Sequence, residues 1–224
     1  MAEEQKGRST HAIVPLHTPK LSKARLSKVL SKDERAKLTL AMLDHVLSVL
    51  QRARTISTVT VVSADRDVRP EVEKRSARFI WEGRTRGLNS AITFAQRNFG
   101  PKSSSSILII HADLPTLAPR DVDSFVRAAR NYQIVIAPSK DGAGTNALYF
   151  QKPNLISTVF GPRSFHKHLK LIRKKSLRHK IVRLSGIGFD LDSSYDLKRL
   201  LQARASNDVS RFIRKLYKQR DKCR

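Results

Sequence analysis

The chain has very little cysteine and no long apolar run. Its single cysteine, Cys223, cannot form an internal disulfide, which predicts a reducing compartment such as the cytoplasm. The polar first ten residues lack the apolar segment of a signal peptide, and no apolar stretch is long enough to cross a bilayer. We therefore expect no membrane partner. Aromatic residues make up only 6% of the chain, which is few for a surface that stacks nucleic-acid bases.

Acidic residues are also scarce. The chain has 19 Asp and Glu against 44 Lys and Arg, a formal net charge of +25. Residues 142–189 contain ten Lys or Arg and no acid, and the last twenty residues contain seven Lys or Arg and two aspartates. Such an excess attracts polyanions, so a basic nucleic-acid-binding protein is one hypothesis and an enzyme for small phosphorylated substrates is another. We expect the last segment to make weak, nonspecific polyanion contacts.

The length of 224 residues favours one domain, here over residues 11–204, between a polar leader (1–10) and a basic C-terminal helix or tail (205–224). Strands are predicted over residues 11–16, 56–62, 77–81, 107–110, 134–137, 146–150, 181–184 and 186–189. Helices are predicted to begin at residues 31, 68, 87, 119, 164, 195 and 206, the first with a Ser31/Glu34 capping box. This alternation predicts a layered α/β domain with a mostly parallel sheet, and we expect Trp81 and Phe99 in its core.

Two of the predicted strands run into carboxylates. Residues 107–110 lead to Asp113, and residues 186–189 lead to Asp190 and Asp192. Ligands of open α/β sheets bind at the carboxyl ends of the strands, and converging carboxylates suit Mg²⁺ with the phosphates that it carries. The alternative is structural, with Asp113 in a turn before Pro115 and the other two aspartates capping the next helix.

Other segments have residue types that suit phosphate binding. Lys20, Lys23, Arg25 and Lys28 follow the first strand, so they are expected at the same sheet edge as Asp113, where they could neutralise phosphates. Ordinary surface basicity is the alternative, and the preferred one for Lys20 and Lys28. The turn 141–146 has two glycines beside Thr145, which let a backbone approach a ligand but also suit a plain hairpin. Gly161 and Ser164 lie where a basic helix begins, and the N-terminus of this helix could bind an anion. Gly87 and Asn89 open another helix. For both sites an ordinary helix start is the alternative. His166 and His168 do not share a helix face, which disfavours a metal pair.

Short segments in a fixed order are similar to those of one enzyme family. They are Val14-Pro15, Lys23-Ala24-Arg25-Leu26, Gly87-Leu88-Asn89, His111-Ala112-Asp113-Leu114-Pro115, Asp141-Gly142-Ala143-Gly144-Thr145-Asn146-Ala147-Leu148, Gly161-Pro162-Arg163-Ser164-Phe165 and Asp190-Leu191-Asp192. Over residues 11–200 the chain resembles the 2-phospho-L-lactate guanylyltransferases (CofC or FbiD) of coenzyme F-420 biosynthesis. The resemblance implies a single three-layer nucleotidyltransferase domain, GT-A-like as in nucleotide-diphospho-sugar transferases. It also implies transfer of GMP from GTP to 2-phospho-L-lactate or phosphoenolpyruvate, with release of pyrophosphate.

The resemblance also implies roles for individual residues. Asp113 and Asp190 would hold Mg²⁺, with Asp192 as a nearby alternative. The expected catalytic residues are Asp113, Lys23 and Arg25, the expected nucleotide-binding residues are Pro15, Lys23, Gly87 and Asn89, and the expected acceptor-binding residues are Thr145, Gly161 and Ser164. The chain departs from the family at His17, where a lysine is usual, and neighbouring Lys20 is the expected substitute for that charge.

Overall fold

The computed structural model describes residues 9–84, 87–98, 105–202 and 208–221. The leader up to residue 8, Phe99, the loop 101–104, the junction 203–207 and Cys223 lie outside these ranges. The strands are β1 (Thr10–Pro15), β2 (Ile56–Ser63), β3 (Arg78–Trp81), β4 (Ser106–Ile110), β5 (Ile134–Pro138), β6 (Thr145–Phe150) and β7 (His179–Ile181). The helices are α1 (Lys32–Arg52), α2 (Arg69–Glu73), α3 (Leu88–Arg97), α4 (Pro119–Arg127), α5 (Ser164–Lys174), α6 (Ser185–Gly188), α7 (Ser194–Gln202) and α8 (Asp208–Asp221), with 3-10 turns η2 (Pro19–Leu21), η3 (Ala24–Leu26), η4 (Arg66–Val68) and η5 (Ala128–Asn131).

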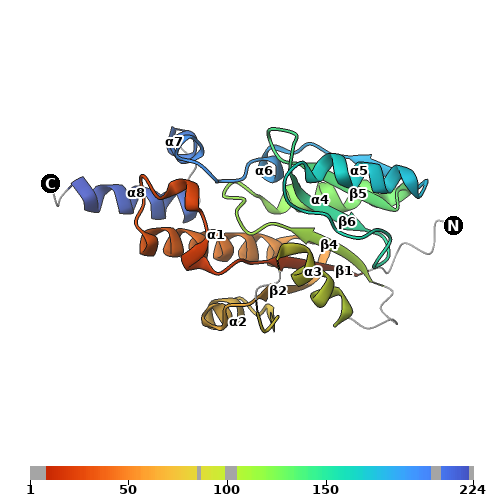
Figure 1. The fold of residues 1–224 in the computed structure, drawn as a ribbon, viewed down its shortest axis with the longest axis horizontal. Helices are drawn as coiled ribbons and strands as arrows, with labels where there is room; N and C mark the ends of the chain where they lie inside the picture. The colour runs from red at the N-terminus through yellow and green to blue at the C-terminus, as the bar shows by residue number, and fades with distance from the viewer. Residues whose placement is uncertain (1–8, 85–86, 99–104, 203–207, 222–224) are drawn as a thin grey trace.

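The strands form one seven-stranded sheet in the order β3-β2-β1-β4-β6-β5-β7. The neighbouring pairs are parallel except at β6, which runs antiparallel to both β4 and β5. The mostly parallel α/β sheet expected from the sequence is confirmed. Since β1 and β4 are parallel neighbours, the segments that follow them begin at the same edge of the sheet (Figure 1).

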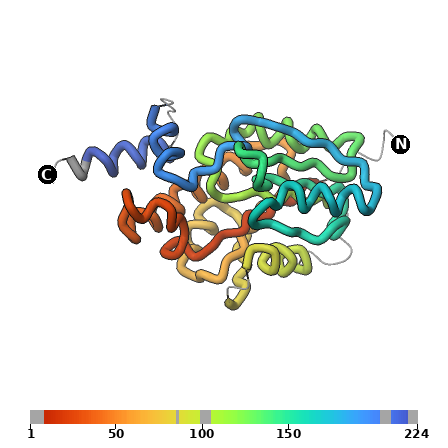
Figure 2. Tube along the Cα trace, turned by 45° about the horizontal axis from the view of Figure 1, so that its top comes forward, coloured from red at the N-terminus to blue at the C-terminus, as the bar shows by residue number. Residues whose placement is uncertain are grey.

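Helices cover both faces of this sheet, and successive strand residues pack on opposite sides. Val14 and Leu108 belong to the core that includes residues of α1, α2 and α4. Ile13 and Ile109 belong to a second core, which includes residues of α3 and α5. The chain is therefore layered as helix, sheet, helix, and the tube view shows α3 and α5 on the same side of the sheet (Figure 2).

A third apolar cluster lies beyond the end of the sheet. It joins Leu26 of η3, Leu38 and Met42 of α1, Leu191, and residues of α7 and α8. Helix α8 packs against α1 at one end of the molecule, beyond the sheet (Figure 1). The cluster thus fixes two connecting segments, the one after β1 and the one that contains Leu191. None of the helices in the described ranges is long and apolar enough to span a membrane.

Three expectations are wrong. Residues 186–189 do not form a strand, because residues 185–188 form the short helix α6. The carbonyls of Ile187 and Gly188 accept hydrogen bonds from the Asn146 side chain. The strand expected over 181–184 is instead β7, which ends at Ile181. Trp81 is 42% exposed on the edge strand β3, where the Arg66 guanidinium lies 3.4 Å from its ring centroid. The capping box of Ser31 and Glu34 is confirmed.

Candidate active site

Two segments distant in sequence meet at the carboxyl end of β4. The backbone N–H of Leu191 donates a hydrogen bond of 3.1 Å to the carbonyl oxygen of Asp113. Leu191 itself is fully buried in the third core. Because Asp190 and Asp192 flank Leu191, this bond holds both of these residues beside Asp113.

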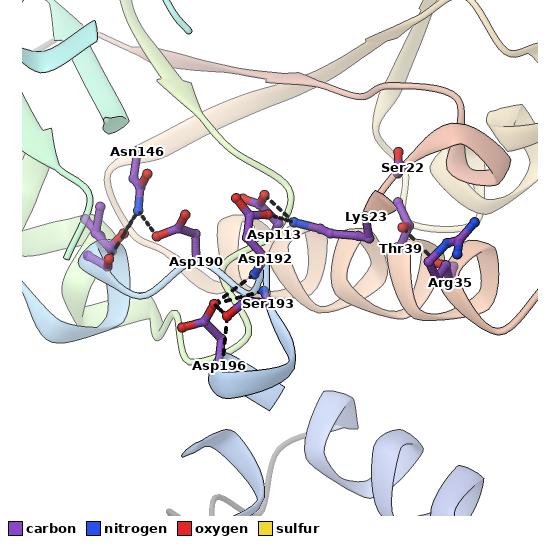
Figure 3. A network of polar contacts seen from close by, with 12 residues as sticks. Ser22, Lys23, Arg35, Thr39, Asp113, Asn146, Asp190, Asp192, Ser193 and Asp196 are labelled. Carbon is purple, nitrogen blue, oxygen red and sulfur yellow. Dashed lines mark hydrogen bonds and ion pairs between the residues drawn. The ribbon is translucent and has the colours of Figure 1, made fainter. Parts of the chain in front are cut away.

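Lys23 lies between two of the three carboxylates. Its Nζ is 2.6 Å from Asp113 Oδ2 and 2.6 Å from Asp192 Oδ1, and its side chain is only 8% exposed (Figure 3). Burial would lower the pKa of Lys23, but the charges and hydrogen bonds of Asp113 and Asp192 outweigh it and raise the pKa. Burial likewise opposes the charge of Asp113, and the charges of Lys23 and His111 hold the pKa of Asp113 below its usual range. The site therefore keeps one cation between two anions.

Asp190 has no such cation among the residues that the structure describes. Its Oδ1 accepts a hydrogen bond of 3.3 Å from Asn146 Nδ2, and it lies between Asn146 and the Asp113–Asp192 pair (Figure 3). Burial raises the pKa of Asp190, the nearby charges of Asp113 and Asp192 raise it further, and the Asn146 hydrogen bond opposes them only partly. Three carboxylates with one ammonium leave an excess of negative charge that a divalent cation would neutralise.

Asp190 and Asp192 do not cap α7, as the structural alternative expected. The backbone N–H and the Oγ hydroxyl of Ser193 both donate to Asp196 Oδ2, at 2.9 Å and 2.6 Å. The Asp196 N–H in turn donates to Ser193 Oγ. Ser193 and Asp196 therefore cap this helix, and Lys140 pairs with the other Asp196 oxygen at 2.9 Å. The side chains of Asp190 and Asp192 are left for the site.

A cavity of about 410 Å³ opens beside Lys23 and Asp113. It is lined by Pro15, Leu16, His17, Thr18, Leu21, Ser22, Lys23, Thr39, Met42, Leu88, His111, Ala112, Asp113 and Asp192. A larger cavity of about 570 Å³ lies between α4, α6 and α7, but none of the three clustered aspartates lines it. The smaller cavity is therefore the candidate active site.

The three expected acceptor-binding residues gather around the start of α5. The Phe165 N–H donates to the carbonyl of Ala143 at 3.1 Å, which holds the 141–145 turn against this helix start. Ser164, whose N–H bonds the Gly161 carbonyl, is 2% exposed, and Thr145 is 1% exposed. Gly161 has a φ of 119°, a backbone conformation that strongly favours glycine.

Asn89 has a different set of contacts from the one expected. Its Nδ2 donates to the Phe160 carbonyl at 3.0 Å, and its Oδ1 accepts from the Phe160 N–H at 2.7 Å. The amide thus joins the start of α3 to the segment before Gly161. Gly87, the residue before α3, has a φ of 88° that again favours glycine.

The basic residues after β1 are not equivalent. Lys23 enters the cluster of carboxylates, whereas Arg25 and Lys28 are exposed and have no ion pair in the described part of the chain. His17 lines the cavity, and Lys20 is exposed outside its lining. The structure therefore brings Lys23 to the aspartates and leaves Lys20 and Arg25 on the surface of the loop.

Three site residues were given no role by sequence reasoning. His111 lines the cavity, and its Nε2 is buried without a hydrogen-bond partner in the described ranges. Asn146 holds α6 and Asp190, and the buried His168 bonds Thr145 at 3.0 Å. Asn146 and His111 belong to the family motifs of residues 141–148 and 111–115, so their place in these motifs could have indicated a role in the site. His168 lies outside them, and its buried contacts depend on the tertiary fold.

Mg²⁺ fits the donor chemistry of the cluster. Within the described ranges, no group of three or more His, Cys, Asp or Glu side chains is placed to hold a metal ion. Mg²⁺ usually takes one or two carboxylates, with phosphate oxygens and water completing its shell. Asp113 Oδ1 is buried and has no hydrogen-bond partner in this part of the chain, and Asp190 is a second carboxylate beside it. An unpartnered buried oxygen is costly, so it is suited to a cation.

Comparison with known proteins places these features in context. A family model described as "Guanylyl transferase CofC like" matches residues 10–220, a range that includes all but the last residue of α8. The phosphoenolpyruvate guanylyltransferase of Sphaerobacter thermophilus is 33% identical over 192 residues, 86% of this chain and 92% of that protein. The 2-phospho-L-lactate guanylyltransferase of Methanocaldococcus vulcanius is 36% identical over 186 residues, 83% of this chain and 81% of that protein.

The fold has relatives among solved structures as well. A candidate nucleotide-diphospho-sugar transferase from Desulfovibrio desulfuricans superposes with a TM-score of 0.75 at 17% sequence identity. The match covers 93% of this chain and 95% of that one. The nucleotidyltransferase-like fold expected from the sequence is confirmed.

Proposed function

The chain belongs to the family of CofC-like guanylyl transferases, and from that premise we propose that it transfers GMP from GTP to a small phosphorylated carboxylic acid. The acceptors that its relatives' names support are 2-phospho-L-lactate and phosphoenolpyruvate. The product would serve coenzyme F-420 biosynthesis, and the single cysteine supports a cytoplasmic location. The observation that carries the proposal is the meeting of Lys23, Asp113 and Asp192 in the lining of one cavity, with the Asp190 carboxyl close enough to feel the charges of both aspartates.

The reaction needs no general base. A phosphate oxygen of the acceptor, already anionic near neutral pH, attacks the α-phosphorus of GTP. A new P–O bond forms there as the bond to the β-phosphate oxygen breaks, and pyrophosphate leaves with its electron pair. Catalysis of such a step consists of alignment and of neutralising charge on the phosphates.

The side chains of this site suit that task. Lys23 is a buried, permanently charged ammonium at the cavity, where it can bind a phosphate oxygen of the nucleotide. Pro15 and Leu88 give the cavity apolar walls beside it, and His17 and His111 add imidazoles. Gly87 and Asn89 shape the start of α3, and Arg25 would reach the nucleotide phosphates from its exposed position.

Asp113 and Asp190 would hold Mg²⁺, with Asp192 as the nearby alternative. Bound there, the ion would withdraw charge from the phosphate oxygens and orient them. The residues of the chain keep these carboxylates in place through the Leu191–Asp113 backbone bond and through Asn146. Thr145, Gly161 and Ser164 would bind the phosphate and carboxylate of the acceptor at the start of α5, a helix terminus that favours anions.

The direct test is to identify the product. Purified protein is incubated with GTP, Mg²⁺ and either 2-phospho-L-lactate or phosphoenolpyruvate, and phosphorus-31 NMR is recorded. We expect pyrophosphate together with two new resonances of a mixed diphosphate. ATP, CTP and UTP in place of GTP test the base preference. Absence of a diphosphate product with every phosphorylated three-carbon acid would reject the proposal.

The nucleic-acid-binding hypothesis is less well supported than the transferase. Family membership and the fold both favour a transferase. Helix α8 still exposes Lys215 and Lys218, so we propose that it makes weak, nonspecific polyanion contacts. Such contacts would weaken steeply with salt, whereas guanylyl transfer would continue.

A further inference from the structure

We propose that His168 is a positioning residue that fixes the Thr145 hydroxyl as a hydrogen-bond donor towards an anionic oxygen of the acceptor. The inference rests on the proposed function, in which Thr145 binds that acceptor. It is carried by the hydrogen bonds on the two ring nitrogens of His168, which determine where the proton of Thr145 can point.

The first hydrogen bond determines the tautomer of His168. The backbone N–H of Val159 donates to His168 Nε2 at 3.0 Å. A backbone N–H can only donate, so Nε2 must present its lone pair and carry no proton. A neutral imidazole in this position therefore has its proton on Nδ1.

The second hydrogen bond determines the orientation of the Thr145 hydroxyl. His168 Nδ1 lies 3.0 Å from Thr145 Oγ1, and a protonated Nδ1 donates to that oxygen. The hydroxyl proton of Thr145 then cannot point back at His168. The hydroxyl has no other hydrogen-bond partner within the described ranges, so its proton is left for an acceptor group that enters the site.

The surroundings keep the ring neutral and fixed. His168 is fully buried, and its ring packs edge-on against Phe160 with centroids 4.9 Å apart. Asn89 holds the backbone of Phe160 on both sides. Burial, together with His111, lowers the pKa of His168 to about 4, and a hydrogen bond that the ring donates to the Ser164 backbone opposes this only partly. The cationic form, which would place a second N–H against Val159, is thus disfavoured at neutral pH.

The consequence concerns the recognition of an anion. A threonine hydroxyl can present either a proton or a lone pair, and a lone pair would repel a carboxylate or phosphate oxygen. With His168 donating to it, Thr145 presents its proton before the acceptor arrives, at the start of α5 where Ser164 also lies. Pre-ordered donors of this kind lower the cost of binding an anion.

Two substitutions of His168 separate the two hydrogen bonds. The amide NH₂ of His168→Asn can replace the Nδ1 donor to Thr145, whereas the amide oxygen of His168→Gln can replace the Nε2 acceptor of Val159. We expect His168→Gln to raise the KM for the acceptor about tenfold, the effect of one hydrogen bond to a charged group, with the KM for GTP unchanged. His168→Asn should stay within about twofold of the wild type. His166→Gln, an exposed position on the same helix, is the control.

A double-mutant cycle tests whether His168 acts through Thr145. Thr145→Val should raise the acceptor KM, and adding His168→Gln to it should have no further effect. A full additional increase, or a parallel rise in the KM for GTP, would overturn the proposal. Nitrogen-15 NMR of the ligand-free wild type should find His168 protonated at Nδ1 alone, and the opposite tautomer would contradict the assignment. A wild type without any transfer would refute the proposed function, whereas an active enzyme unaffected by His168→Gln would refute only the role of His168.

Discussion

The backbone N–H of Leu191 is hydrogen-bonded to the carbonyl oxygen of Asp113, and this bond joins two loops that carry the three clustered carboxylates. Leu191 is also part of the apolar cluster that contains Leu26, three residues after Lys23. The same small core therefore positions the ammonium and two of the carboxylates. Packing at the end of the sheet, and not the sheet alone, determines the geometry of the site.

Replacing Lys23 tests the contribution of its charge. Lys23→Met keeps much of the side-chain volume but removes the ammonium that lies between Asp113 and Asp192. We expect pyrophosphate release to slow by about 100-fold or more, the usual effect of losing one group that stabilises developing charge. The control is Lys20→Met, an exposed lysine of the same loop, which should stay near the wild-type rate. Comparable rates for the two variants would contradict this role of Lys23.

Replacing Asn89 distinguishes its observed contacts from direct nucleotide binding. Asn89→Ala removes both hydrogen bonds to Phe160, so the segment before Gly161 loses its tie to α3. We expect the KM for the acceptor to rise about tenfold while the KM for GTP changes little. Asn98→Ala is a matched control, since within the described ranges that amide bonds the Phe94 carbonyl at the end of the same helix. A selective rise in the KM for GTP would instead favour the role implied by the family resemblance.

The lowered pKa values of two buried histidines predict that the protein loses stability in mild acid. Burial lowers the pKa of His11 and of His168 from 6.5 to about 4. Between these values the unfolded chain binds protons that the folded chain does not, so the free energy of unfolding falls as pH decreases from 6.5 to 4. Each histidine contributes about 3 kcal/mol to this loss.

Urea denaturation of the wild type and of His168→Asn at pH 7 and pH 4.5 measures the effect. The variant should lose less stability over this interval, because asparagine does not titrate. Asp190, whose pKa is raised, acts with the opposite sign in both proteins and cancels from the comparison. Equal losses in the two proteins would contradict a neutral, buried His168.

Helix α8 is expected to contribute to stability. Val209 and Ile213 are buried in the third core, together with Leu38 and with Met42, which also lines the cavity. Ile213→Ala should lower the free energy of unfolding by about 2–5 kcal/mol, as for other buried isoleucines. Lys215→Ala, on the exposed face, should change it by less than about 0.5 kcal/mol. A negligible effect of Ile213→Ala in urea denaturation would support an independent tail over residues 205–224.

Much of the fold could be predicted because its signals are local. Apolar, β-branched runs such as residues 107–110 became buried strands, and the Ser31/Glu34 box began α1. Residues 186–189 have a similar apolar run, but Gly186 approaches Asp121 so closely that a side chain would collide, and the segment folds as α6. Apolar character alone does not distinguish a strand from a buried helical turn.

The site was predictable where chain order and sheet topology suffice. Parallel neighbours β1 and β4 place Lys23 and Asp113 at one edge, which the strand pattern had predicted. The contacts of Asn89 with Phe160 and of His168 with Thr145 join segments far apart in sequence, so no local pattern could predict them. Trp81, which was expected in the core, lies on the edge strand β3 and contacts Arg66. This could not be predicted, because the order of strands in a sheet cannot be read from composition.

Metal binding measured without turnover tests the central claim most directly. Mn²⁺, a spectroscopic substitute for Mg²⁺, is titrated into the protein with GTP and followed by electron paramagnetic resonance. The wild type should bind the ion in a nucleotide-dependent manner, and Asp113→Asn should weaken this binding at least about tenfold, since a charged ligand is lost. Unchanged Mn²⁺ affinity in Asp113→Asn would contradict a metal site built on the three clustered carboxylates.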